Sequence, residues 1–460
     1  MRSDPRNITG LALVVAMGGF LLGFDATVIS GAVGPISRYF ALNGESGSLK
    51  LGWAVSCLGW GAMAGNLLAG VLNDRFGRRA VLLLTALLFL CSAQLAAFST
   101  SFGVFVSARI CGGIAVGIAL LTAPVYIAEI SPARRRGALV SLNQLMIVFG
   151  ISVSYFSNFF LLGVGPHNWR WMLGVQALPA LAFLLLLISV PESPRWLLTR
   201  GRAAHSLAVL SSLHGAQVGQ QLLVEIQDSL RSEPGASRIG EVLGRRLRFV
   251  LLFSLGIAFF QQITGINAIF YYLPTIFAQV GGGQSSAYAQ AALVGVVNVG
   301  MTFVAIRLID RLGRRPLLMA GVSGMALALL TISWAFHAAE SPGSTTQLAD
   351  ARLVLGAIIV YVACFAISLG PVMWVLLSEI FPNEQRAAAI AVVGVWNSLV
   401  SASVTFIFPW ELARFGPDGT FLGYGLLAVA GLLFLAGFAP ETKGRSLEQL
   451  ESLLARPVAP

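Results

Sequence analysis

Long apolar runs separated by short polar segments dominate this chain of 460 residues. A helix that crosses a bilayer needs roughly 20 apolar residues, because the hydrocarbon core is about 30 Å thick. Several runs exceed that length, which indicates tilted or locally broken helices. The expected break points are Pro35, Pro124, Pro274 and Pro371. The predicted spans are residues 8–36, 51–72, 80–98, 102–128, 138–162, 171–190, 249–278, 288–308, 316–336, 352–377, 387–409 and 420–438. The pattern thus predicts an all-α membrane protein with twelve transmembrane helices.

The composition supports this class. Hydrophobic residues make up 56% of the chain and charged residues only 11%, whereas a soluble domain carries about 25% charged residues. So few charges cannot coat so much apolar surface. The net charge of +10 does not indicate nucleic-acid binding, because the arginines fall in short clusters between apolar runs, as charges next to a membrane do.

The start of the chain and its cysteines have simple interpretations. The first apolar run is longer than the core of a signal peptide and has no small-residue cleavage site before Asp25, so we expect a retained first span. The four cysteines lie in apolar stretches without the spacing of a metal site or a disulfide framework. We therefore expect no bound metal and no other cofactor.

A set of charged motifs occurs twice in the same order. The first copies read GVLNDRFGRR, EISPARRRG and PESPR, and the second read DRLGRR, EIFPNEQR and PETKGR. The offsets are 236, 250 and 249 residues, for Asp74/Asp310, Glu129/Glu379 and Pro191/Pro440. Two related halves in a mostly apolar chain indicate a transporter, because such repeats can rock against each other around a central site.

The placement of arginines predicts the orientation. Arginines occupy the loops after the second, fourth, sixth, eighth and tenth spans, whereas the loops after the third and seventh carry no charge. The positive-inside rule therefore puts both termini in the cytoplasm. One long polar segment has helical periodicity and mixed charge, which predicts short amphipathic helices on the cytoplasmic face. The expected domains are a six-helix half at 1–192, this helical linker at 193–248, a second six-helix half at 249–440, and a cytoplasmic helix and tail at 441–460.

The motifs taken together resemble the sugar porter family of the major facilitator superfamily. The resemblance also rests on GFDATVISG (Gly23–Gly31), QQITGIN (Gln261–Asn267) and GPVMW (Gly370–Trp374), and it covers nearly the whole chain. It implies the fold of six plus six helices, a cytoplasmic helical bundle, and transport of a monosaccharide or polyol by alternating access.

Asp25 lies in the middle of the first apolar run. A charged residue at the centre of a membrane helix costs about 2.5–3.5 kcal/mol on insertion scales, so it is a functional candidate by default. Arg109, in the fourth span, is its natural partner. The alternative is a purely structural ion pair. In the family, an acid here resembles that of the proton symporters, and uniporting glucose facilitators have a neutral residue. We therefore predict proton–sugar symport, with Asp25 as proton carrier and Arg109 as its modulator.

Intramembrane amides are candidates for sugar binding, because each offers hydrogen-bond donors and acceptors without the desolvation cost of a charge. These residues are Gln144, Gln261, Gln262, Asn267, Asn298 and Asn397. Each could instead make a hydrogen bond between helices. If the seventh span is one regular helix, Gln261 and Asn267 lie about two turns apart on roughly one side.

The resemblance implies further roles for particular residues. The amide positions and Trp374 match the sugar contacts of the family, and Phe24 and Phe365 match aromatic residues that line its pocket. Tyr271 and Tyr272 match the gate on the outer side, although an interfacial aromatic belt is an equal alternative. The chain departs from the family at Ser398 and Ala366, where some members have a tryptophan and the facilitators an acid. These departures leave the sugar unspecified.

The repeated charges predict a salt-bridge network at the cytoplasmic ends of the helices. Surface ion pairs contribute only about 0–1 kcal/mol each, and orientation signals alone would account for some of the arginines. Acids that recur at a fixed distance from arginine are not explained that way, and Glu129/Arg136 and Glu379/Arg386 have the same spacing. The family resemblance implies that the network holds the halves together. The predicted members are Asp74, Arg75, Arg78, Arg79, Glu129, Arg136, Asp310, Arg311, Arg314, Arg315, Glu379 and Arg386.

Other functional classes fit less well. No HExxH, GxSxG or GxxxxGK[ST] motif is present, so an enzyme or an ATP-driven pump is not indicated. A sugar sensor usually has a long cytoplasmic extension, which we do not find. A sugar uniporter and a polyol or inositol symporter remain open. The expected partners are a small sugar, a proton and the lipid bilayer, and we expect a monomer in a bacterial plasma membrane.

Overall fold

The computed structural model describes residues 5–232, 242, 244, 247–281, 283–340, 350–382 and 385–442. Every regular element in these ranges is helical. The first are α1 (Pro5–Tyr39), α2 (Gly44–Phe76), α3 (Arg78–Ala97), α4 (Phe102–Ile130), the 3-10 turn η1 (Ala133–Arg135), α5 (Arg136–Leu161), α6 (Asn168–Gly174), α7 (Ala177–Leu187), α8 (Pro194–Thr199), α9 (Ala203–His214) and α10 (Ala216–Ser232). The others are α12 (Arg248–Ile263), α13 (Ile266–Gln279), α14 (Gly283–Leu312), α15 (Arg314–Glu340), α16 (Ala351–Ile367), α17 (Leu369–Ile380) and α18 (Arg386–Phe438).

The apolar helices confirm the predicted fold class. Eleven helical stretches of the described residues are long and apolar enough to cross a membrane. The last of them, α18, contains two predicted spans, 387–409 and 420–438, which meet at a kink at Gly416 (φ 70°, ψ 173°). Each of the twelve predicted spans is therefore largely helical, and the sixth is split between α6 and α7 at Val175–Gln176. The predicted C-terminal helix lies beyond residue 442, outside the described residues.

The breaks within spans differ from the prediction. Pro35, Pro124 and Pro274 lie inside α1, α4 and α13. A proline lacks the N–H donor and its ring crowds the carbonyl four residues earlier, but in a membrane protein neighbouring helices and polar side chains can satisfy the carbonyl it frees. The seventh span instead breaks at Thr264–Gly265, between α12 and α13, and the tenth at Ser368, between α16 and α17. Only Pro371 is close to a break, in the first turn of α17.

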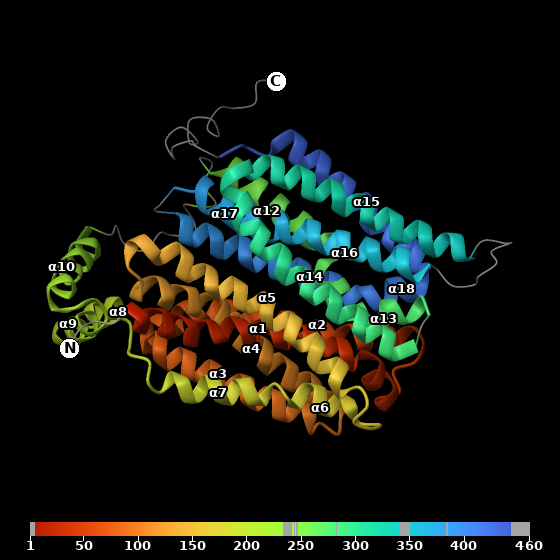
Figure 1. The fold of residues 1–460 in the computed structure, drawn as a ribbon, viewed down its shortest axis with the longest axis horizontal. Coiled ribbons are helices and arrows are strands. Elements are labelled where there is room, and N and C mark those ends of the chain that lie inside the picture. Colours follow the sequence, from red (N-terminus) through yellow and green to blue (C-terminus); the bar gives the residue numbers. More distant parts are fainter. Residues whose placement is uncertain are drawn as a thin grey trace. The chain divides into compact units, whose positions relative to one another are not determined.

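By proximity of its parts, the chain divides into two compact units. The first comprises residues 1–32 and 57–236, and the second comprises residues 33–56 and 237–460. In the first unit, α3 packs on α4 and α7, and α4 packs on α5 (Figure 1). The four predicted functional domains stay a prediction.

Apolar burial holds the first unit together. Its core contains Phe89, Tyr126 and Phe183, from α3, α4 and α7, all fully buried. Burying such a side chain contributes about 1.5–3 kcal/mol. In the second unit, α15 packs on α16 and α18, and α12 packs on α18. Other large side chains on the long helices, such as Leu178, Leu327 and Leu433, are 69% exposed. Such apolar faces suit helices that lie in lipid.

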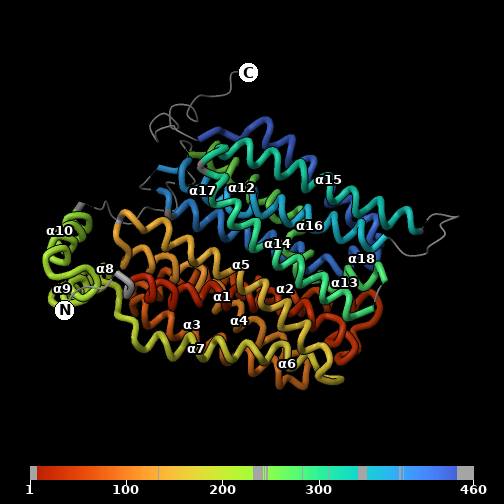
Figure 2. The backbone as a smooth tube through the Cα atoms, viewed as in Figure 1, coloured from red at the N-terminus to blue at the C-terminus, as the bar shows by residue number. Residues whose placement is uncertain are grey.

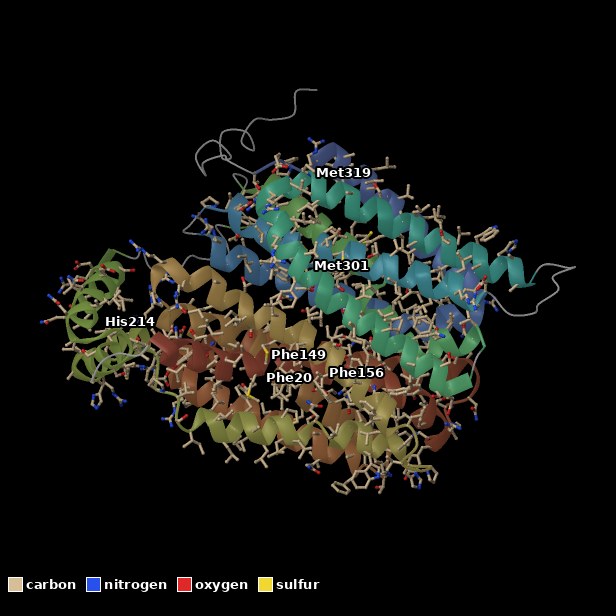
Figure 3. The ribbon with its side chains drawn as sticks, viewed as in Figure 1. Phe20, Phe149, Phe156, His214, Met301 and Met319 are labelled. Atoms are coloured by element: carbon tan, nitrogen blue, oxygen red, sulfur yellow. The ribbon has the colours of Figure 1, made fainter. Side chains whose placement is uncertain are left out.

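Helices α8, α9 and α10 form a compact group at one end of the first unit's long helices (Figure 2). The indole Nε1 of Trp196 donates to the carbonyl of Asp74 at 2.9 Å, and Arg200 donates to the carbonyls of Asp74 and Arg75 at 2.8 Å. These bonds fix α8 to the end of α2. His214 is the last residue of α9 in this group (Figure 3). Burial lowers the pKa of its imidazole.

Candidate functional site: a buried ion pair and an amide network

Asp25 and Arg109 form an ion pair inside the first unit. Both side chains are about as buried as any in the molecule, at 1% exposure each. The Arg109 guanidinium contacts the Asp25 carboxylate through Nη1, and its Nη2 donates to the backbone carbonyl of Asp25 at 3.0 Å. Removal of one member of such a pair typically costs about 3–5 kcal/mol, since it leaves an uncompensated buried charge. The predicted partnership of these residues is therefore seen in the structure.

One oxygen of this carboxylate is different from the other. Among the described residues, Asp25 Oδ2 is buried and has no hydrogen-bond partner. It faces Gly112 of α4, where a side-chain Cβ would collide with Oδ2 and with the hydroxyl of Ser92. The absence of a side chain at Gly112 thus leaves room beside Oδ2. An unpaired buried carboxylate oxygen is satisfied when its environment supplies a donor, and a carboxylate oxygen that takes up a proton loses its charge and becomes a donor itself.

In the second unit, four predicted amides form one connected network. Asn397 donates to Gln261 Oε1 at 2.7 Å, and Gln262 donates to Asn397 Oδ1 at 3.1 Å. Asn267 donates to Gln262 Oε1 at 2.9 Å and to the hydroxyl of Ser401 at 2.7 Å. Gln261 in turn donates to the carbonyl of Leu369 at 2.7 Å. The network joins α12, α13 and α18 and ends on the α16–α17 break.

The seventh span is not one regular helix from Gln261 to Asn267. Gly265 adopts the left-handed conformation (φ 86°, ψ 16°), which ends α12 and starts α13. Glycine adopts this conformation without the steric cost that other residues meet. The break brings the Asn267 amide onto Gln262 instead of placing it two turns further along a straight face. The amides therefore meet at a joint between two helices.

The other predicted sugar contacts are more scattered. Gln144 of α5 is exposed and Phe24 of α1 is buried, and both belong to the first unit. In the second unit, Asn298 of α14 is buried, Phe365 of α16 is half-buried, and Trp374 of α17 is 37% exposed. No hydrogen bond in the described residues joins these five side chains to the amide network.

Some neighbours of the predicted site were missed. Phe20 of α1 packs against Phe24 and against Phe149 of α5, with ring centroids 5.9 and 6.1 Å apart. Phe149 and Phe156 of α5, labelled in Figure 3, are 50% and 38% exposed. Their spacing of seven residues places them on one helix face, which was the available signal. Ser401, four residues after Asn397, could have been found in the same way.

The predicted gate tyrosines lie on α13. Tyr272 is buried and packs on Phe408 of α18, with ring centroids 5.1 Å apart, whereas Tyr271 is half-buried. Buried packing of Tyr272 does not fit an interfacial belt, in which the ring end would be wet.

Each unit contains a bidentate arginine–glutamate pair at the end of its helices. Arg78 donates through Nε and Nη2 to Glu129 at 3.1 and 3.0 Å, and Arg314 donates in the same way to Glu379 at 3.1 and 2.7 Å. Glu129 and Glu379 therefore bind the arginines of the DRxGRR motifs. Arg136 and Arg386, which share the spacing of seven residues from these glutamates, do not bond to them: Arg136 is exposed and Arg386 donates to the Phe381 carbonyl.

Two further acids complete these networks. Glu192 accepts hydrogen bonds from the backbone N–H groups of Arg78 and Arg79, at 2.9 and 3.1 Å. Glu441 does the same for Arg314 and Arg315, at 3.2 and 3.1 Å. Each carboxylate thus caps the first turn of a helix, α3 or α15, where free N–H groups and the helix dipole favour a negative charge. The repeated PES and PET motifs were the signal for them.

The remaining predicted network members are peripheral. Arg79 donates to the Ile188 carbonyl at 2.6 Å, and Arg315 donates to the Ala436 carbonyl at 2.8 Å. Asp74 is 83% exposed, with Oδ1 3.8 Å from Arg78 Nη1. Arg75 and Arg311 are exposed, and the side chain of Asp310 lies outside the described residues.

We predict that Glu129→Gln and Glu379→Gln each lower the free energy of unfolding by about 1–3 kcal/mol, because each removes the bidentate charged acceptor of a largely buried guanidinium. The measurement is the midpoint of thermal unfolding in detergent. Asp228→Asn is the control, since Asp228 pairs with Arg231 while 66% exposed. Equal midpoints for all three variants would contradict a structural role for the bidentate pairs.

The chain is similar in sequence to known sugar transporters. The family model described as "Sugar (and other) transporter" matches residues 11–454. The D-xylose-proton symporter of Escherichia coli (strain K12) is 37% identical, over 97% of this chain and 95% of that protein. The arabinose-proton symporter of Bacillus subtilis (strain 168) is 35% identical, over 96% of this chain and 94% of that protein.

Solved structures are similar over the whole chain. The inward open conformation of the xylose transporter XylE from E. coli has a TM-score of 0.83 and 35% identity, and covers 97% of this chain and 99% of that one. A partially occluded inward open conformation of the same transporter has a TM-score of 0.84, with 96% and 99% covered. The chain therefore belongs to the sugar transporter family, with the fold of the major facilitator superfamily, and is a multi-pass membrane transporter, not an enzyme.

Proposed function

We propose that this protein imports a monosaccharide by symport with a proton, through alternating access. The observation that carries the proposal is the buried Asp25–Arg109 pair with its unpartnered Oδ2. Relatives named as D-xylose-proton and arabinose-proton symporters support it and favour a pentose as substrate. A transported charge that moves through 100 mV gains about 2.3 kcal/mol, which supports roughly fifty-fold accumulation.

Asp25 is the proposed proton carrier and Arg109 its modulator. A nearby guanidinium favours the ionised carboxylate, whereas burial in an apolar environment opposes ionisation. A movement of α4 relative to α1 changes both effects at once, because Arg109 lies on α4 and Asp25 on α1. Oδ2 is the carboxylate oxygen that accepts no hydrogen bond, so its lone pairs are free to take up a proton, which supports this oxygen as the site of protonation.

The amide network is the proposed core of the sugar site. Its donors and acceptors are bonded to one another, so a sugar hydroxyl can replace an amide partner without leaving a buried group unsatisfied. Trp374, with its partly exposed ring, is proposed to cover a C–H face of the sugar. Gln144, Asn298, Phe24 and Phe365 are proposed as additional contacts, and Tyr271 and Tyr272 as the gate.

The orientation and setting are part of the proposal. The arginines gather at the helix ends that hold the bidentate pairs, and the positive-inside rule favours a cytoplasmic location for these ends and for both termini. We propose a monomer in the plasma membrane of a bacterium, as the bacterial relatives favour. The charged networks of both halves are proposed to act together as a latch when the sugar site faces outward.

We predict that Asp25→Asn abolishes uphill accumulation of sugar and retains counterflow, because asparagine keeps the volume and carbonyl of the side chain but cannot carry the proton. The measurement is uptake of labelled D-xylose, L-arabinose and D-glucose into proteoliposomes with an imposed pH gradient. Asp228→Asn is the control for loss of a carboxylate. Undiminished uphill uptake by Asp25→Asn would refute the coupling role, and wild-type uptake without proton uptake would indicate a uniporter.

We predict that Gln261→Ala and Trp374→Ala each weaken sugar affinity about tenfold, the effect of losing one hydrogen bond or one stacking contact. Equilibrium binding of the transported sugar to purified protein measures this. Gln220→Ala, on the exposed face of α10, is the matched control. Unchanged affinity in both site variants, with normal folding, would rule out the proposed sugar site.

A further inference from the structure

The joint between α12 and α13 divides the proposed sugar site. Gln261 and Gln262 lie before it, and Asn267 lies after it, together with the gate tyrosines. At the joint, Gly265 is left-handed and Thr264 is 1% exposed. Buried backbone without regular helical bonds must be stabilised by its neighbours. The packing around Thr264 and Gly265 therefore determines how freely α13 can turn on α12.

Two tyrosines hold this joint from two different helices. The hydroxyl of Tyr361, on α16, donates to the Thr264 carbonyl at 2.9 Å. The ring of Tyr424, on α18, lies directly against Gly265, where a side-chain Cβ would collide with its Cε2 and Cδ2 atoms. Tyr361 is fully buried and Tyr424 is 4% exposed. The Tyr361 hydroxyl is thus held by its hydrogen bond to the joint, whereas Tyr424 contacts the joint only through its ring.

The position of Tyr424 depends on Glu411. The Tyr424 hydroxyl donates to Glu411 Oε2 at 2.7 Å. Glu411 precedes the kink at Gly416 and Tyr424 follows it, so the bond connects the two limbs of α18. Tyr424 also reaches α13 through a second aromatic residue. Its ring stacks on Phe408, with ring centroids 6.2 Å apart and ring planes at 17°, and Phe408 packs on Tyr272 of α13. Tyr424 therefore borders α13 at the joint and, through Phe408, two turns further on.

We propose that the Glu411–Tyr424 hydrogen bond positions the Tyr424 ring against Gly265 and thereby restrains the turning of α13 at the joint. Glu411 and Tyr424 are positioning residues, since the hydrogen bond acts on α13 through the ring. The consequence for transport rests on the function proposed above: the bond sets the rate at which the gate end of α13 moves, with little effect on sugar binding.

The test compares variants that remove the bond with variants that keep it. Tyr424→Phe loses the hydroxyl and keeps the ring, and Glu411→Ala loses the acceptor. Glu411→Gln retains a carbonyl acceptor and should behave as wild type. Tyr126→Phe is the matched control, because Tyr126 is also buried and loses a single bond of 2.7 Å, to the Pro191 carbonyl in the other unit.

Hydrogen–deuterium exchange of the purified full-length protein measures how readily the backbone amides at the joint open, without any assumption about transport. We expect exchange in residues 264–273 to rise about tenfold in Tyr424→Phe and Glu411→Ala, and the double variant to exceed neither, because both changes break the same bond. Tyr126→Phe and Glu411→Gln should leave these amides unchanged. A rise confined to residues 408–424, or a rise also produced by Tyr126→Phe, would overturn the proposal.

Sugar flux in proteoliposomes then tests the restraint at the joint separately from the proposed transport function. We expect the maximum rate of counterflow to change at least threefold in Tyr424→Phe and Glu411→Ala, while equilibrium sugar affinity stays within about twofold of wild type. If the wild type transports no monosaccharide, the proposed function is wrong, but the exchange result still tests whether the Glu411–Tyr424 bond restrains α13. If the wild type transports sugar and both variants match it in exchange and rate, the positioning role is wrong.

Discussion

The absence of hydrogen-bond partners in hydrocarbon is the constraint on which this structure depends. In a bilayer, each polar group must be satisfied by the protein itself, and many buried polar residues of both units follow this rule. Arg109 bonds both to the Asp25 side chain and to its backbone. The amides around Gln262 bond to one another and to the carbonyl of Leu369. Other buried side-chain atoms of the described residues depart from the rule, among them both Asp25 Oδ2 and Arg109 Nε.

The same constraint explains where helices are interrupted. The break at Thr264–Gly265 is tolerated because Tyr361 bonds to the Thr264 carbonyl and because the Tyr424 ring covers Gly265. The amides lie at the break, where a polar group from a ligand can enter the network in place of a side chain. A broken helix lined with polar groups is the usual place for a substrate in transporters of this kind. The interruption and the proposed site are therefore two aspects of one arrangement.

Much of the fold could be predicted from the sequence, because a membrane span is a local property of about 20 residues. Asp25 with Arg109 and the amides around Gln261 also stood out, since polar residues are rare within apolar runs. Partner choice could not be predicted in the same way. Equal spacing suggested Arg136 for Glu129, yet the guanidinium that reaches Glu129 comes from Arg78 on another helix. Likewise, the pattern gave no sign that Gly265 is left-handed, and prolines inside α1 and α4 did not break them.

Glu192 has a mechanical consequence. Its carboxylate holds the start of α3, and α8 begins two residues later, tied in turn to the last turn of α2 through Trp196 and Arg200. The group of helices α8, α9 and α10 is thereby attached to α2 and α3 at two separate points. A tether that pulled on α8, such as a binding protein or a surface attachment, would transmit its force straight to the membrane-spanning bundle, with no slack chain between them to absorb it.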